Sequence, residues 1–147
     1  MSQLNREAIL SKLSRMVDRL DSLKRFEAIS LSAYLEDEDC QLIVERQLEL
    51  LIQSALDINK AFLKRATSPK NSAAISNYES FMVMGELGFL PPTLAQAIAP
   101  SGSFRNVLAH DYDDIDADQV YAALQKALTQ YPQYVRAIHT YLDTLED

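Results

Sequence analysis

The chain has only two histidines, His110 and His139, and the first of them lies in a segment rich in polar side chains. Arg105 precedes His110 by five residues, and Asn106 follows the arginine directly. Cleavage of a phosphodiester without a metal ion needs a group that transfers a proton near neutral pH and a cation that stabilises charge on the phosphate. Histidine and arginine supply these roles, and the Asn106 amide can orient a hydroxyl or a phosphate oxygen. The segment is therefore a candidate for phosphate chemistry, with a helix end that carries a structural histidine as the alternative.

The spacing of this segment limits how one chain can assemble such a site. Residues five apart lie about 140° from each other around an ideal helix, so Arg105 and His110 do not share a face. Arg105 and Tyr112 are seven apart and do share one. Convergence of Arg105 and His110 requires either a distorted helix end or a second copy of the segment brought in by a dimer.

The acidic residues that follow do not have the spacing of a metal site. The aspartates of this stretch are Asp111, Asp113, Asp114, Asp116 and Asp118. An EF-hand loop that began at Asp114 would need glycine at its sixth position and an acidic residue at its twelfth, where the chain has Gln119 and Gln125. We expect a solvated loop and helix cap here, with no bound metal ion and no cofactor.

Other catalytic patterns are missing from the sequence. It contains no glycine-rich phosphate loop, no cysteine and histidine spacing for a metal, and no GxSxG elbow, which disfavours nucleotide hydrolases and triad esterases. His139 lies among apolar residues of the last predicted helix, and we interpret it as a structural or surface residue.

Length and charge restrict the class of protein further. The 147 residues favour a single domain over residues 1–147, and the net charge of −7 argues against a general binder of nucleic acids or membranes. Any contact with RNA must be local, and residues 51–70 carry four basic side chains against one acidic one. The single Cys40 excludes an internal disulfide, and no segment has the length of an apolar membrane span. We expect a protein of the cytoplasm that does not contact the membrane.

Hydrophobic periodicity predicts helices throughout the chain. The first helix, over residues 4–25, is predicted to bury Leu10, Leu13, Val17, Leu20 and Leu23. The longest covers residues 41–65, and a shorter one starts at Ser76 or Asn77 and ends at Gly85 or Gly88. Pro100 predicts a kink or two pieces in the next helix, and Pro132 one kinked helix or two in tandem after a cap at Asp116 or Asp118. No strand pattern appears, so the fold class is all-α, an up-and-down helical bundle of four or five helices.

Three segments in this order resemble HepT-like proteins of the HEPN superfamily. The segments are Glu45-Arg46-Gln47-Leu48-Glu49 through Ala55-Leu56-Asp57-Ile58, Tyr78-Glu79-Ser80-Phe81 with Gly85-Glu86-Leu87-Gly88, and Phe104-Arg105-Asn106-Val107-Leu108-Ala109-His110-Asp111-Tyr112 with Ile115-Asp116 and Val120-Tyr121. The last of them is similar to the family's Arg-x4-His-x-Tyr signature. The resemblance covers most of residues 40–128 and, more loosely, the whole chain.

This resemblance implies a toxin of a type VII-like toxin–antitoxin pair that acts as a metal-independent ribonuclease on transfer RNA or messenger RNA. Arg105 and His110 would be its catalytic pair, assisted by Asn106, in a homodimer whose two motifs line one cleft. The family's partner is an MntA-like nucleotidyltransferase antitoxin, which would neutralise the toxin by attaching AMP to Tyr112. The alternative is a catalytically silent HEPN module that binds a nucleotidyltransferase or a nucleotide. Retention of all four motif residues favours the enzyme, whereas the net acidity favours the silent module.

Overall fold

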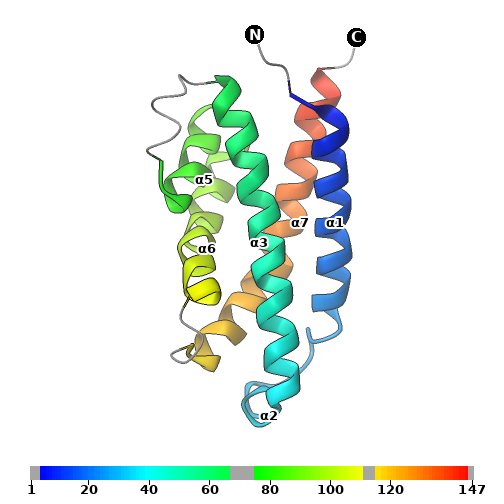
Figure 1. Ribbon diagram of the computed structural model, residues 1–147, viewed down its shortest axis with the longest axis vertical. Coiled ribbons are helices and arrows are strands. Elements are labelled where there is room, and N and C mark those ends of the chain that lie inside the picture. Colours follow the sequence, from blue (N-terminus) through cyan, green and yellow to red (C-terminus); the bar gives the residue numbers. More distant parts are fainter. Residues whose placement is uncertain (1–3, 67–74, 111–114, 146–147) are drawn as a thin grey trace.

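The computed structural model describes residues 4–66, 75–110 and 115–145, and over these ranges it is built from helices with no strand. The helices are α1 (Arg6–Lys24), α2 (Leu31–Glu36), α3 (Glu38–Ala66), α5 (Asn77–Glu86), α6 (Pro92–His110) and α7 (Ala117–Thr144). Helices α1, α3 and α7 lie side by side along the long axis, and α5 and α6 pack against the other side of α3 (Figure 1). The predicted all-α, up-and-down bundle is confirmed.

One helix more than predicted is present in the described part of the chain. The additional element is α2, where Ser30 caps the first turn by accepting a hydrogen bond from the backbone N–H of Ala33 at 3.1 Å. Asp37 then leaves the helical conformation, and its carboxylate accepts from the N–H of Cys40 at 3.0 Å. The acidic stretch therefore separates two helices and caps the second, because a side-chain oxygen can satisfy a free N–H at a helix start.

The buried face of α1 differs from the predicted one. Val17 is 42% exposed, and Ile9 and Met16 are buried in the core. The observed stripe, Ile9, Leu13, Met16, Leu20 and Leu23, alternates spacings of four and three residues and so follows the helical repeat. The predicted set used two consecutive spacings of three, which drift away from a single face.

Neither proline divides its helix. Helix α6 continues through Pro100 and α7 through Pro132, so for each proline the alternative of two separate pieces is excluded and the alternative of one kinked helix stays a prediction. Pro100 is exposed, as is Gln96, whose carbonyl loses its helical partner at the proline. Water can solvate that carbonyl, which explains why the helix tolerates Pro100 although a proline has no backbone N–H to donate.

Two glycines bring α5 and α6 into close contact. A Cβ on Gly85 would lie 2.5 Å from Ala95 Cβ, and one on Gly102 would lie 2.8 Å from the carbonyl oxygen of Asn77. Gly88, with φ of 85°, provides the left-handed residue that ends α5. The start of α5 is thus held against the second half of α6.

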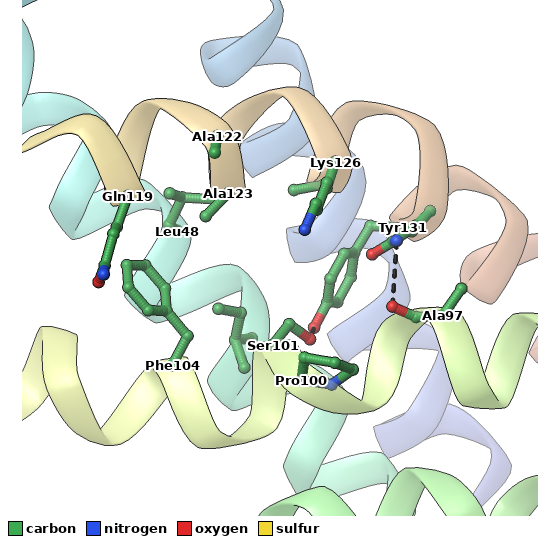
Figure 2. Close-up of a pocket in the computed structure, with 13 residues that line it drawn as sticks. Leu48, Ala97, Pro100, Ser101, Phe104, Gln119, Ala122, Ala123, Lys126 and Tyr131 are labelled. Carbon is green, nitrogen blue, oxygen red and sulfur yellow. Dashed lines mark hydrogen bonds between the residues drawn. The ribbon is translucent and has the colours of Figure 1, made fainter.

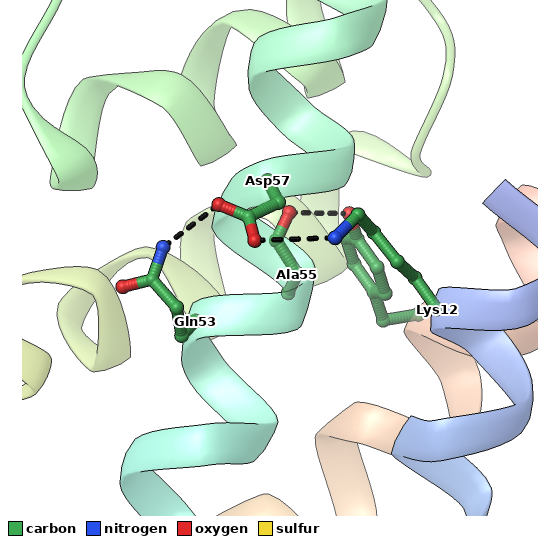
Figure 3. Close-up of polar contacts among 5 residues, drawn as sticks. Lys12, Gln53, Ala55 and Asp57 are labelled. Atoms are coloured by element: carbon green, nitrogen blue, oxygen red, sulfur yellow. Dashed lines mark hydrogen bonds and ion pairs between the residues drawn. The ribbon is translucent and has the colours of Figure 1, made fainter. Parts of the chain in front are cut away.

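Polar contacts fix α3 between its neighbours. Lys12 of α1 lies 3.4 Å from an Asp57 oxygen of α3, and Gln53 donates to the other oxygen at 2.8 Å (Figure 3). From the side of α7, the Tyr134 hydroxyl donates to the carbonyl oxygen of Ala55 at 3.0 Å. These contacts hold the helix that α5 and α6 pack against. Across the described residues, no helix combines the length and apolar character needed to cross a bilayer.

Candidate functional site

The three described motif residues lie in the last two turns of α6. Arg105 is half-buried, Asn106 and His110 are exposed, and His110 is the final residue of the helix. Because α6 stays helical up to His110, a distorted helix end does not bring Arg105 and His110 together. Within one chain, therefore, the two side chains do not share a face of the helix.

Asn106 and His110 form the exposed face of this site. Residues four apart lie on one side of a helix, so these two side chains share a face of α6. Asn77, at the start of α5, donates from Nδ2 to Asn106 Oδ1 at 3.3 Å. The contact uses the acceptor oxygen of the Asn106 amide and leaves its N–H groups for another partner.

Arg105 has an unsatisfied donor. Its Nε is buried and has no hydrogen-bond partner within the described part of the chain. Buried N–H groups are nearly always paired in folded proteins, because an unpaired one loses its hydration without compensation. Because the fold encloses this atom, an anion from outside the chain would reach the guanidinium only through its terminal N–H groups, which suit phosphate and carboxylate oxygens.

The loop after α6 falls partly outside the described residues. Tyr112, the predicted site of modification, lies outside them, as do Asp111, Asp113 and Asp114. Asp116 is the N-cap of α7, and its carboxylate accepts from the N–H of Asp118 at 2.9 Å, which confirms one of the two predicted caps. Among the described residues, no group of three histidine, cysteine or acidic side chains could hold a metal ion. His139 is exposed on α7, as the surface interpretation predicted.

Two clefts flank the motif on different sides of α6. A cleft of about 480 Å³ lies between α6 and α7, where Phe104 of α6 lies beside Gln119 and Ala123 of α7, and the Tyr131 hydroxyl of α7 reaches Ser101 of α6 (Figure 2). Residues two apart lie about 200° from each other around a helix, so Phe104 and Asn106 point to nearly opposite sides. The second cleft, about 380 Å³, includes Lys60 and Lys64 of α3 together with Asn77. The amide of Asn77 therefore connects a basic surface to the motif.

Sequence reasoning identified Asn77 only as a possible helix cap and missed its contact with Asn106. The two residues are 29 positions apart, and no local pattern pairs them. The close approach at Gly102, one turn before Asn106, was the one available signal, since a glycine inside a helix can mark a contact with another backbone.

The described helices form an all-α bundle with Arg105, Asn106 and His110 in the last two turns of α6. The model of the family described as "HepT-like: Ribonuclease HepT-like" matches residues 16–138. The chain belongs to this family.

Comparison with individual proteins agrees with this assignment. The chain is 46% identical to the tRNA nuclease HepT of Aphanizomenon flos-aquae (strain 2012/KM1/D3), over all of this chain and 98% of that protein. The fold is similar to a tri-AMPylated Shewanella oneidensis HEPN toxin solved in complex with its MNT antitoxin, with a TM-score of 0.74 and 18% identity over 95% of this chain and 99% of the other. It is also similar to the cytosolic protein YutE of Bacillus subtilis, with a TM-score of 0.78 and 18% identity over 98% and 94% of the two chains.

Proposed function

We propose that this protein is a metal-independent ribonuclease toxin that cuts RNA with Arg105 and His110. The observation that carries the proposal is the placement of half-buried Arg105 and exposed Asn106 and His110 in the last two turns of one helix, α6. Membership of the Ribonuclease HepT-like family supports it. The name of the 46% identical relative points to transfer RNA as the substrate, with messenger RNA as the other candidate.

The chemistry follows from the two side chains. His110 accepts the proton of a ribose 2′-hydroxyl, and the 2′-oxygen attacks the adjacent phosphorus. Arg105 stabilises the extra negative charge on the phosphate oxygens while the bond to the 5′-oxygen breaks. The leaving oxygen takes up a proton, so the products carry a 2′,3′-cyclic phosphate and a 5′-hydroxyl. Asn106 donates an N–H to a phosphate oxygen and so orients the reacting group.

A homodimer completes this site. In one copy Arg105 and His110 lie about 140° apart around α6, so they reach one phosphate only when the ends of two α6 helices meet. In that arrangement Arg105 of one copy and His110 of the other act on the same phosphate. The exposure of both Asn106 and His110 leaves this helix face open to a second chain and to RNA.

The distribution of charge supports a local RNA contact. The net charge is −7, yet the cleft beside Asn77 is lined by Lys60 and Lys64. Lysines in such a cleft attract phosphates without contacting bases. RNA bound along this cleft would pass Asn77 at the start of α5 and so come close to Asn106.

An antitoxin of the nucleotidyltransferase type is the proposed partner. It would transfer AMP to Tyr112, and the added phosphate would place negative charge beside Arg105 and His110 and exclude RNA. The similar Shewanella oneidensis complex, a tri-AMPylated HEPN toxin with an MNT antitoxin, supports this regulation. The toxin and its target RNA would meet in the cytoplasm.

The net acidity favours one other function, a catalytically silent module that binds the nucleotidyltransferase. Expression of the wild type and His110→Ala in a bacterial host without the antitoxin separates the two. Growth arrest and shortened small RNAs with the wild type only would support the ribonuclease. Equal growth with intact RNA in both strains, at equal protein levels, would refute it and favour the silent module.

A further inference from the structure

A chain of buried polar side chains runs through the core toward the motif. Asn59 of α3 and Ser80 of α5 are the buried polar residues of the described structure, and Asn59 is completely inaccessible. A buried amide must be paired on both its oxygen and its nitrogen, or its lost hydration destabilises the fold. A hydrophobic residue at such a position would carry no cost of lost hydration, so a polar group in a core calls for an explanation.

The hydrogen bonds of this polar chain connect three helices. The Tyr134 hydroxyl of α7 has one proton, which it shares between Asn59 Oδ1 at 2.7 Å and the carbonyl oxygen of Ala55 at 3.0 Å. Asn59 Nδ2 donates to the Ser80 hydroxyl at 3.1 Å, and that hydroxyl donates to the carbonyl oxygen of Asn77 at 2.8 Å. The series therefore begins on α7, passes through α3 and α5, and ends at the backbone carbonyl of Asn77, the first residue of α5.

The same backbone group is fixed from the side of α6. Gly102 allows α6 to approach so closely that a Cβ there would lie within 3 Å of the Asn77 carbonyl. With its carbonyl held by Ser80 and its backbone against Gly102, Asn77 has a defined position. Its side chain then donates to Asn106 Oδ1.

This contact determines which end of the Asn106 amide faces outward. An amide has an acceptor oxygen on one side and a donor NH₂ on the other. Because Asn77 donates to the oxygen, the NH₂ of Asn106 is left for the RNA phosphate. A phosphate oxygen can accept from the NH₂, whereas it would be repelled by the carbonyl oxygen of a reversed amide.

We propose that Asn77 is a positioning residue, held by the Tyr134–Asn59–Ser80 chain, that orients the Asn106 amide so that its NH₂ faces the scissile phosphate. The proposal rests on the ribonuclease function proposed above. It assigns to the buried polar chain a role in activity, since the chain ends at the residue that donates to Asn106.

Two substitutions at Asn77 test the orientation. Asn77→Ala removes the donor and lets the Asn106 amide rotate freely. Asn77→Asp replaces the donor by an acceptor, so Asn106 reverses its amide and presents its oxygen to the phosphate. An aspartate in the first turn of a helix is favourable to the helix, so this variant should fold at least as well as the wild type.

The rate at which each variant cleaves a short RNA measures the effect of the substitutions on activity. We expect Asn77→Ala to lower kcat about tenfold with little change in KM, which corresponds to the loss of one oriented hydrogen bond. Asn77→Asp should lower kcat about 100-fold while its thermal stability is equal or higher. Asn5→Ala is the matched control, because it also removes an asparagine at a helix start, where Asn5 caps α1, and should leave kcat unchanged.

Two kinetic results would overturn the proposal. One is an Asn77→Asp enzyme as active as the wild type, and the other is an Asn77→Ala enzyme that behaves like Asn5→Ala. If Asn77 had a purely structural role, activity would follow stability across the three variants. The proposal instead expects Asn77→Asp to be the least active variant although its stability is equal to that of the wild type or higher.

A spectroscopic readout separates this proposal from the ribonuclease function itself. In ¹H–¹⁵N spectra, the side-chain NH₂ signals of Asn106 should move in Asn77→Ala and in Ser80→Ala but stay in place in Asn5→Ala. If the wild type cuts no RNA, the proposed function fails and the catalytic role of this contact fails with it, whereas moved Asn106 signals would still support the orientation by Asn77. Asn106 signals that are the same in all variants would refute the orientation directly.

Discussion

The contact between Gly102 and the start of α5 allows a prediction whose sign depends on the tertiary structure. Inside an isolated helix, alanine is more favourable than glycine by about 1 kcal/mol. In the protein, the added Cβ of Gly102→Ala would lie 2.8 Å from the Asn77 carbonyl oxygen and 3.2 Å from the Tyr78 nitrogen. These are backbone atoms, so no flexible side chain can move aside, and α5 must shift.

The magnitude follows from the two opposing effects. Overpacking of a tight contact destabilises a fold by roughly 1–3 kcal/mol, and we take about 2 kcal/mol here. After the gain in helix propensity of about 1 kcal/mol, Gly102→Ala should lower the free energy of unfolding by about 1 kcal/mol. For a chain of this length such a loss lowers Tm by about 3 °C.

Thermal unfolding at a fixed protein concentration measures this effect. Ser103→Ala is the matched control, because Ser103 is the exposed neighbour in the same helix and the substitution should raise stability slightly through propensity alone. If Gly102→Ala is more stable than the wild type, like an isolated helix, then α5 and α6 do not approach as closely as described, and the placement of Asn77 beside Asn106 is wrong.

Two further predictions concern the tyrosines. Burial raises the pKa of the Tyr131 and Tyr134 hydroxyls well above the ordinary value of 10, and these groups keep their protons in the fold when the unfolded chain loses them. The folded state then binds more protons, so their contribution is complete below pH 10 and stability falls above it, by up to about 1.4 kcal/mol per pH unit for each tyrosine. Urea unfolding from pH 9 to 11 measures the slope; Tyr131→Phe should make it shallower, and an unchanged slope would contradict the assignment. Tyr112→Phe, mixed with the nucleotidyltransferase, ATP and Mg²⁺, should gain no AMP by intact-protein mass spectrometry, and a gain equal to that of the wild type would place the acceptor at another residue.

Local sequence patterns predicted the elements of this fold because the energies that decide them are local. The helical repeat of apolar residues located the helices, and Ser76 and Asp116 were each one of two candidate caps, because a cap bonds to an N–H group within three residues. At Pro100 the sequence left a kink or two pieces open, because whether a helix continues through a proline depends on whether the freed carbonyl can be solvated, which the exposed Gln96 allows. Val17 was misplaced because the predicted stripe drifts off the buried face of α1, where Met16 lies instead.

The candidate site was predictable only in part. Arg105, Asn106 and His110 are close in sequence, so their residue types and spacing were visible. The unsatisfied Arg105 Nε and the Asn77–Asn106 contact depend on how α5 packs against α6, which no spacing within the motif determines. The buried Asn59 appeared in the sequence as one member of an otherwise apolar stripe, and only its partners Ser80 and Tyr134 give it a role.

The most direct test of the account is complementation between two inactive variants. Arg105→Ala and His110→Ala carry different tags and are co-expressed and purified as a mixed dimer, and cleavage of transfer RNA is measured in EDTA. In a site shared between two copies, the mixed dimer keeps one intact pair of Arg105 and His110. The account predicts no cleavage by either variant alone and about half of the wild-type rate for the mixed dimer, without a metal ion. An inactive mixed dimer would contradict the shared site, and a His110→Ala protein that cuts RNA as fast as the wild type would contradict the catalytic role of the motif itself.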